Sequence, residues 1–365
     1  MKRRWIAALC ALLLALTCGL CACRKDEETF TPKPVDGIPL AFDDGTSYYA
    51  WAPSAVVEGD KMYMFYNSNK TAGQNDASVA LRVGTASANG WEFGERTVVL
   101  EASESGWDAG GVSDADVVKG TFSYQGTQYS WLMAYQGRPD RAETEHQIGF
   151  ALANAPEGPW VKTGDPVIGY DSAVTGYAWG VGQPSLISYD RGGKVYLSYT
   201  RGEALFTGQF LAELDCSDCA AVKGADAAFM LPEAGLRDGG SGQLMFNNAG
   251  FAARGNDWYV ARDFNPVASA APSVATAVQV AHIAQADVYT AGGSWTVDEE
   301  RINFLDLAAE NNNGWERVYA ASIVKDAYGQ AYGDGITVAA SVTSYDPSTR
   351  EYLFFQGIVL YTLGA

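Results

Sequence analysis

Short apolar runs separated by polar turn residues predict short β-strands that are paired in hairpins. The stretch 177–202 has an apolar run at 184–188, a turn at 190–193 and a second apolar run at 194–199. Gly192 and Gly193 favour the turn because glycine adopts positive φ without steric cost. The second run is rich in β-branched and aromatic residues, which favours a strand.

The hairpin pattern recurs at 56–66, 117–135, 251–262 and, more loosely, at 344–355. Aligned on the last residue of the second strand, the copies lie 69, 64, 63 and 93 residues apart, at Tyr66, Tyr135, Tyr199, Arg262 and Phe355. A long period of this kind predicts an all-β fold, a five-bladed β-propeller with about four antiparallel strands per blade. A β-sandwich is the alternative, but its turn signals come about every 8–12 residues without a longer period.

The beginning of the chain is predicted to lie outside the propeller domain, which we place at 41–365. The basic triplet at 2–4 and the apolar run at 5–16 are typical of a signal peptide. The sequence LCAC at 20–23 fits a lipoprotein cleavage box, which makes residues 1–22 the signal peptide and Cys23 the lipidated residue. An ordinary secretory signal is the alternative. Residues 23–40 then form the lipidated N-terminus and a tether.

The run RKDEE at 24–28 resembles the surface-export signal of Bacteroidota lipoproteins. This resemblance implies an outer-membrane lipoprotein that is exposed on the cell surface and touches the membrane through its N-terminal lipid only. The net charge is −18, or −21 without the three basic residues of the signal peptide. Such a charge argues against nucleic acid or anionic lipid as a partner. We expect a monomer.

Few residues of the domain suit metal or nucleophile chemistry. Cys216 and Cys219 form an isolated C-x-x-C pair, which is weak evidence for zinc and fits either a local disulfide or two buried thiols. The two histidines, His146 and His282, are too few for a multi-histidine metal site, and neither lies near a nucleophile-elbow motif. No cofactor is required by this composition. A Ca²⁺ ion is left open, because oxygen-rich loops permit one although no calcium loop of fixed spacing is present.

The stretch 148–167, IGFALANAPEGPWVKTGDPV, is similar to a Gly-Pro-Trp segment of five-bladed propeller glycoside hydrolases of the family-43 type and their relatives. The segments 184–199 and 113–118 resemble the same group. The resemblance covers most of 45–360 as a repeat pattern. It implies a carbohydrate-active propeller whose partner is an oligo- or polysaccharide and whose site lies at the central axis, where the innermost strand of each blade begins.

Hydrolysis in such enzymes needs carboxylates from different blades that converge on one sugar. The resemblance puts Asp114 at a matching strand start, and Asp116 follows two residues later, on the same face of a regular strand. The family pattern has Asp before Pro-Ser in the first and third blades, where this chain has Ala52 and Gln183. Gln183 and Asp116 are expected to bind the substrate. The other candidate catalytic residues are Asp238 and Glu316, and the other polar candidates for substrate binding are Asn247, Asn248 and Asp263.

Aromatic side chains near the predicted strand starts suit sugar binding, because an aromatic face packs on the C–H face of a pyranose. We expect Trp51 and Trp179 to contact the ligand. By contrast, Trp91, Trp160 and Trp295 are expected to fill the space between blades, where burial of a large ring stabilises the fold.

Two functions remain open from the sequence. The first is a glycoside hydrolase with Asp114 as one catalytic carboxylate. The second is a non-catalytic glycan-binding lipoprotein, which Ala52 and Gln183 favour because neither side chain titrates. A purely structural propeller is expected to have apolar side chains at the strand starts, where they would close the axis. Ser113, Asp114 and Gln183 are polar, which argues against that function.

Overall fold

The computed structural model describes residues 40–42, 44, 47–88, 90–142, 144–170, 179–203, 206–236, 246–264, 277–290, 292–303, 317–343, 345–346, 351–352 and 357–363. All of them belong to one compact unit, Lys33–Ala365. The other unit, Met1–Pro32, lies outside the described residues, and with it the predicted signal peptide and Cys23. Within the described residues, no helix has the length and apolar character needed to span a membrane.

The described strands pair into four-stranded antiparallel sheets in the order that the repeat predicts. The first sheet consists of β2 (Trp51–Glu58), β3 (Lys61–Asn69), β4 (Ala77–Ser87) and β5 (Gly90–Phe93), with β6 (Thr97–Leu100) beside β4. The second consists of β7 (Gly111–Tyr124), β8 (Thr127–Arg138), β9 (Gln147–Ala153) and β10 (Val161–Lys162).

The third and fourth sheets follow the same plan, each with a short 3₁₀ helix near its outer edge. The third consists of β11 (Gly180–Ser188), β12 (Lys194–Glu203), β13 (Phe206–Asp215) and β14 (Phe229–Met230), with η1 (Ala225–Ala227) between the last two. The fourth consists of β15 (Ala249–Arg254), β16 (Asp257–Phe264), β17 (Ala277–Ala284) and β18 (Thr296–Asn303), with η2 (Gln285–Tyr289) before the last.

The fifth sheet is completed by a strand from the beginning of the domain. β19 (Arg317–Ile323) pairs with β21 (Thr337–Thr343), β21 with β24 (Gly357–Thr362), and β24 with β1 (Leu40–Phe42). The alignment that placed the second strand of this blade at 344–355 is therefore wrong. There, β22 (Tyr345–Asp346) and β23 (Glu351–Tyr352) form a separate two-stranded sheet. The sequence DPSTR at 346–350 resembles the turn sequences of the repeat, which explains the displaced alignment.

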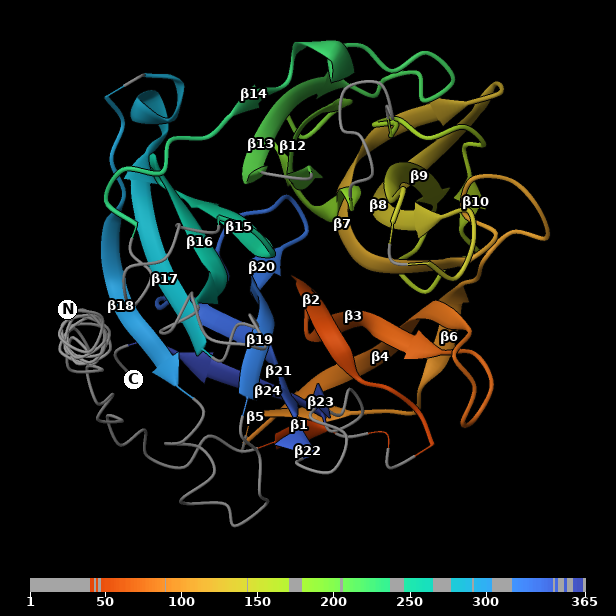
Figure 1. Ribbon diagram of the computed structural model, residues 1–365, viewed down its shortest axis with the longest axis horizontal. Coiled ribbons are helices and arrows are strands. Elements are labelled where there is room, and N and C mark those ends of the chain that lie inside the picture. Colours follow the sequence, from red (N-terminus) through yellow and green to blue (C-terminus); the bar gives the residue numbers. More distant parts are fainter. Residues whose placement is uncertain are drawn as a thin grey trace, which may run out of the picture. The chain divides into compact units, whose positions relative to one another are not determined.

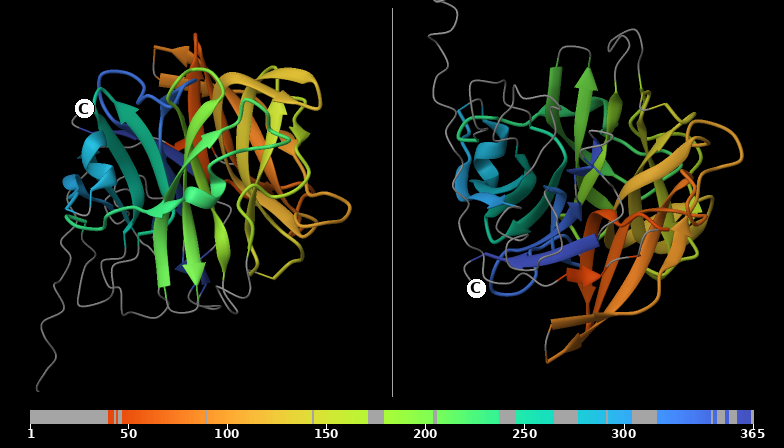
Figure 2. Two further views of the ribbon diagram at one scale, coloured as in Figure 1. Left: turned by 90° about the horizontal axis from the view of Figure 1, so that it is seen from above. Right: turned by 60° about the horizontal axis from the view of Figure 1, so that its bottom comes forward.

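The five sheets stand around a common centre in Figure 1, with β2, β15 and β19 close to it. In the left view of Figure 2 the strands of the third sheet, drawn in green, run nearly upright, along the line of sight of Figure 1. Neighbouring sheets also touch by parallel pairing: β20 (Lys325–Asp326) pairs with β2, and β15 with β19. The all-β propeller predicted from the repeat is the fold of these residues, and the arrangement of the sheets is consistent with the predicted five blades.

The core lies between the sheets rather than within one layer. Every residue of β3 after Lys61 is buried, whereas the outermost β5 is half-exposed to exposed. Strands that are covered on both faces need continuous apolar runs, and this explains the weak alternation of the middle strands. As predicted, Trp91, Trp160 and Trp295 pack against the apolar clusters between sheets.

The C-x-x-C pair lies in the turn after β13, where Cys216 and Cys219 are buried thiols. The Cys219 thiol donates to the carbonyl oxygen of Cys216 at 3.3 Å. The adjacent Cys219 and burial together raise the pKa of the Cys216 thiol.

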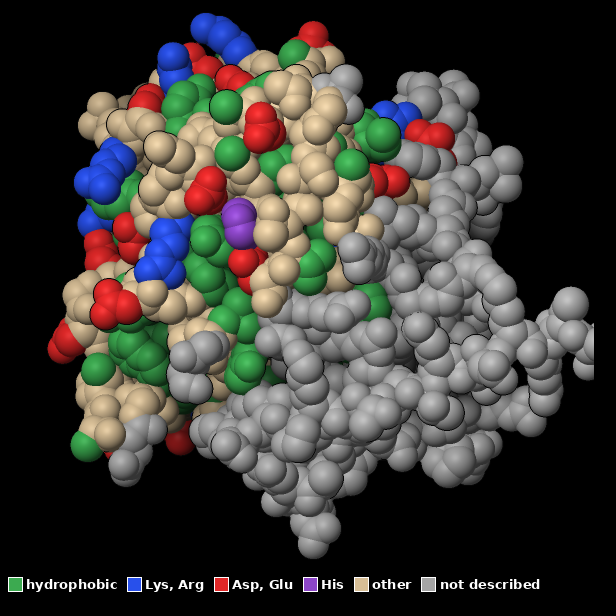
Figure 3. Space-filling model, turned by 90° about the vertical axis from the view of Figure 1, so that its left-hand side faces the viewer, with side chains coloured by type: hydrophobic (Ala, Val, Ile, Leu, Met, Phe, Trp, Pro, Cys, Tyr) green, Lys and Arg blue, Asp and Glu red, His purple; other side chains and the backbone are tan. Residues whose placement is uncertain are grey.

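Charged side chains of both signs occur on the face of the molecule shown in Figure 3. On the face turned toward the viewer in Figure 3, acidic and basic side chains of the described residues are interspersed. The net negative charge of the chain is thus not concentrated into one patch on this face.

Candidate functional site at the propeller axis

The innermost strands of the five sheets begin with the same unusual backbone conformation. Ala52, Asp114, Gln183, Asn248 and Ala320 have φ of 49°, 48°, 53°, 48° and 48°. This left-handed region costs an L-residue roughly 1–3 kcal/mol and is found most often at functional sites. At four of the five positions it coincides with a register shift against the second strand, and the fourth-sheet residue directly precedes β15.

A polar side chain from the preceding sheet holds each of these strained residues in place. In each sheet, one polar side chain of the second strand accepts a hydrogen bond from the backbone N–H of the left-handed residue in the next sheet. The bonds are Asp114 N to Asn67 Oδ1 (2.6 Å), Gln183 N to Gln136 Oε1 (3.1 Å), Asn248 N to Thr200 Oγ1 (3.0 Å), Ala320 N to Asp263 Oδ1 (2.6 Å) and Ala52 N to Ser341 Oγ (2.7 Å). The five bonds form a closed ring that fixes the geometry of the axis.

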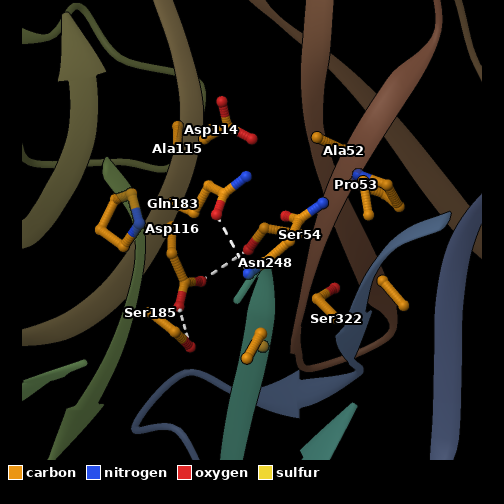
Figure 4. A pocket seen from close by; sticks show the side chains of 15 residues that line it. Ala52, Pro53, Ser54, Asp114, Ala115, Asp116, Gln183, Ser185, Asn248 and Ser322 are labelled. Atoms are coloured by element: carbon orange, nitrogen blue, oxygen red, sulfur yellow. Dashed lines mark hydrogen bonds between the residues drawn. The ribbon is translucent and has the colours of Figure 1, made fainter. Parts of the chain in front are cut away.

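The five strand starts line one pocket that is partly open to solvent. Each sheet contributes three consecutive residues that begin with the left-handed one, namely 52–54, 114–116, 183–185, 248–250 and 320–322. Figure 4 shows these side chains converging from different sheets. The predicted location of the site, at the axis where the innermost strands begin, therefore coincides with a real pocket.

Asp116 lines this pocket, but its carboxylate is bound by side chains and backbone groups of neighbouring sheets. Its carboxylate accepts hydrogen bonds from Ser54 Oγ (2.6 Å), Ser185 Oγ (3.0 Å) and the backbone N–H of Leu186 (2.7 Å). It also forms an ion pair with Lys325, whose Nζ donates to the carbonyl oxygen of Leu186 at 3.0 Å. Both charged side chains are almost completely buried, so this carboxylate acts as an anchor between sheets.

Asp114 occupies a different position from Asp116, although both line the pocket. The register shift between Ser113 and Asp116 breaks the alternation of β7, so the expectation that the two carboxylates share one face is wrong. Their side chains point in different directions in Figure 4. Asp114 is half-buried, and among the five left-handed residues it is the one that carries a carboxylate.

Two amides and a hydroxyl complete the polar lining. Gln183 Oε1 accepts from the backbone N–H of Asn248 at 3.0 Å, and Asn248 Nδ2 donates to Asp263 Oδ2 at 2.8 Å. Asp263 is buried and also holds Ala320, so it positions the site rather than facing the pocket. The Ser322 hydroxyl is buried in the pocket wall and has no hydrogen-bond partner among the described residues.

The other predicted site residues lie beside the pocket or outside the described part of the chain. Trp51 is half-buried against Ala52, Tyr319 and Ala320. Trp179 is half-buried and packs on His146 with ring centroids 4.8 Å apart. Neither tryptophan lines the pocket, nor does Asn247, which precedes the lining residue Asn248. Outside the described residues lie Asp238 and Glu316.

Among the described residues, no group of three or more His, Cys, Asp or Glu side chains is arranged to hold a metal ion. His282 lies on the surface, where its Nδ1 is 2.8 Å from Asp298.

Sequence reasoning missed Ser322, Ala320 and the ring of holding side chains. The signal was present: the alignment ended at Tyr66, Tyr135, Tyr199 and Arg262, and the residue after each of these is the polar one that holds the next sheet. In the fifth sheet the alignment was displaced, which hid the corresponding residue, Ser341.

No protein-family model matches the sequence, and no curated protein matches it. Solved structures do resemble the fold. A thermostable family-43 glycoside hydrolase is 14% identical with a TM-score of 0.53, over 89% of this chain and 96% of that one. A family 117 glycoside hydrolase of Zobellia galactanivorans is 15% identical with a TM-score of 0.55, over 90% and 88%. An alpha-L-arabinofuranosidase of Lactobacillus brevis is 10% identical with a TM-score of 0.54, over 88% and 92%. At such identities the likeness concerns the fold.

Proposed function

We propose that the protein acts on glycans as a glycoside hydrolase, with the axial pocket as the place where the sugar binds. The observation that carries the proposal is the convergence of five strand starts on one pocket with two carboxylates, two amides and three serine hydroxyls in its wall. The pocket is partly open to solvent, which suits one unit of a longer sugar chain. The polar groups match the donors and acceptors of sugar hydroxyls.

In this proposal Asp114 supplies one catalytic carboxylate. Glycosidases pair a carboxylic acid, which protonates the leaving oxygen, with a carboxylate that activates water or attacks the anomeric carbon, and the two stand roughly 5–9.5 Å apart. Asp116 is not assigned either role, because Lys325 and four other donors already bind its carboxylate. The second carboxylate is proposed to be Asp238 or Glu316.

The roles proposed for the remaining candidates depend on whether each residue lines the axial pocket or lies beside it. Gln183 and Asn248 are proposed to bind sugar hydroxyls directly, since both line the pocket. Trp51, Trp179 and Asn247 are proposed to contact neighbouring sugar units of a longer chain, since they flank lining residues.

A non-catalytic glycan-binding protein is the second candidate. Four of the five left-handed residues, Ala52, Gln183, Asn248 and Ala320, carry side chains that neither donate nor accept a proton in hydrolysis. Both candidates require a sugar in the same pocket, and they differ in whether the glycosidic bond is cut.

We further propose that the protein is a monomeric lipoprotein of the outer membrane, lipidated at Cys23 and exposed on the cell surface. The signal-peptide pattern and the RKDEE run after it support this location. Metabolic labelling with a fatty acid should mark the wild type and leave a Cys23→Ala variant unlabelled.

A screen of the purified protein against plant and host polysaccharides and aryl glycosides tests the function. Binding and released sugar are read in the same wells. Release that increases with protein concentration supports the hydrolase. Binding without release supports the second candidate, and the absence of both contradicts the whole proposal.

A further inference from the structure

We propose a second carbohydrate-binding site where the third sheet meets η2 of the fourth sheet, separate from the axial pocket. We call it the tyrosine patch and define it as Tyr189, Tyr196, Glu213, Phe229, Gln285 and Tyr289. Its residues come from the end of β11, from β12, β13 and β14, and from η2 of the fourth sheet. None of them lines the axial pocket.

The members of the tyrosine patch form one continuous surface. The rings of Tyr189 and Tyr196 have centroids 4.4 Å apart, and those of Phe229 and Tyr289 are 5.4 Å apart. Tyr196 and Glu213 are direct partners in the register of β12 and β13. Burial, and then the adjacent side chains of Glu213 and Tyr196, raise the pKa of Tyr289, which places this tyrosine beside both.

Two of the tyrosines are exposed to solvent. Tyr189 is 41% and Tyr289 is 45% exposed, and they are two of the five exposed large hydrophobic side chains among the described residues. Tyr196 between them is buried, and its ring packs edge-on against Trp258 at 4.9 Å. Single exposed apolar side chains are normal on a protein surface, whereas neighbouring ones mark interaction sites. The buried Tyr196 gives the two exposed rings a rigid base.

The polar groups of the patch favour a sugar chain as the occupant. Glu213 is exposed, and Gln285 Nε2 donates to the Tyr196 hydroxyl at 3.3 Å. Ring faces therefore alternate with a carboxylate, an amide and phenol hydroxyls, and a sugar likewise alternates C–H faces with hydroxyls. The core of a protein–protein interface is depleted in charge, which fits Glu213 poorly. Because Glu213 is anionic, a neutral polysaccharide fits better than an acidic one.

The patch and the pocket lie at opposite ends of β11. Gln183 is near the beginning of that strand, and Tyr189 follows its last residue. Six residues of extended chain span about 20 Å, which is too far for one sugar unit to touch both sites. The patch would hold a polysaccharide chain independently of any chemistry at the axis.

Hydroxyl-radical footprinting of the unmodified protein tests this site. The probes are xylan, arabinan, galactan, mixed-linkage β-glucan and, as an acidic polymer, polygalacturonan. We expect at least one neutral polymer to protect Tyr189 and Tyr289 while leaving Tyr332, another exposed tyrosine at 39%, unprotected. No protection by any neutral polymer, or equal protection of Tyr332, overturns the proposal. Protection by polygalacturonan alone overturns the assignment of a neutral glycan.

A variant pair provides the second test. Tyr189→Ala/Tyr289→Ala should weaken retention by the protecting polymer in affinity electrophoresis by about tenfold, and Tyr332→Ala should leave it unchanged. Unchanged retention of the double variant contradicts the site. Failure of the axial proposal is distinguishable, because Asp114→Asn alters sugar release and does not alter footprints at Tyr189 and Tyr289. A pull-down provides the remaining comparison. A protein that binds the wild type, does not bind the double variant and is not displaced by polysaccharide would show that the patch binds a protein, which overturns the glycan proposal.

Discussion

Replacement of Lys325 by methionine should destabilise the propeller more than any surface substitution. The side chain is 1% exposed, and its ammonium group neutralises Asp116 at the point where the first, second, third and fifth sheets approach one another. Methionine has a similar length and no charge. Lys325→Met therefore leaves a buried carboxylate with hydrogen bonds but without a counter-charge.

The expected loss can be estimated from the contacts that remain. Removal of one partner of a buried ion pair costs about 3–5 kcal/mol. Asp116 keeps four donors, namely Ser54 Oγ, Ser185 Oγ and the backbone N–H groups of Leu186 and Val117, so we expect a value near the lower end, about 3 kcal/mol. Urea unfolding followed by tryptophan fluorescence measures this free energy. In a chain of this size the midpoint of thermal unfolding should fall by roughly 6 °C.

The double variant Lys325→Met/Asp116→Asn separates the ion pair from mere packing. With both charges gone, the loss should be smaller than the sum of the two single losses by at least about 1 kcal/mol. A loss below about 1 kcal/mol for Lys325→Met, or strict additivity in the double variant, would refute the view that this pair anchors the sheets.

Three further predictions follow from the axis and the core. Ala320→Gly should raise the free energy of unfolding by up to about 1 kcal/mol in the same assay, because glycine adopts a φ of 48° without strain, and Ala320→Val should lower it. Gly250→Ala should lower the free energy of unfolding by about 1–3 kcal/mol, because a Cβ at this position would lie 2.5 Å from Ser322 Cα. An unchanged unfolding midpoint would show that the fourth and fifth sheets can separate to make room for the methyl group. Burial raises the pKa of Tyr199 to about 12, above the value near 10 in an unfolded chain. The neutral Tyr199 side chain therefore contributes its full stability below about pH 10, and this stability is lost as the pH rises toward 12. The tyrosinate absorbance of Tyr199, obtained as the difference from a Tyr199→Phe variant, should therefore rise together with the loss of circular dichroism and not before that loss.

The sequence was informative about the fold because hairpins leave a local signal. Turn glycines, paired apolar runs and their long period were sufficient to predict a five-bladed propeller, and the innermost strand starts were located at Ala52, Asp114 and Gln183. The fifth blade was misaligned because the sequence at 346–350 resembles the turn sequences of the repeat, and because β1 completes that sheet from the other end of the domain.

The site was harder to predict because residues that are close together in the sequence have different roles in the structure. Asp114 and Asp116 lie two residues apart, yet one faces the pocket and the other is bound to Lys325, more than two hundred residues later. Only tertiary contacts distinguish an anchoring carboxylate from an accessible one. The same holds for Asp263, which appeared as a candidate ligand contact and instead positions Asn248 and Ala320.

The turnover of Asp114→Asn tests the central proposal most directly. Wild type, Asp114→Asn and the surface control Asp60→Asn, in the turn between β2 and β3, are compared on a glycan that the wild type cleaves, with sugar release and affinity measured together. The account predicts that Asp114→Asn lowers kcat at least about a hundredfold, leaves affinity within a few-fold, and that Asp60→Asn matches the wild type. Unchanged turnover by Asp114→Asn would contradict the assignment of this residue to catalysis at the propeller axis.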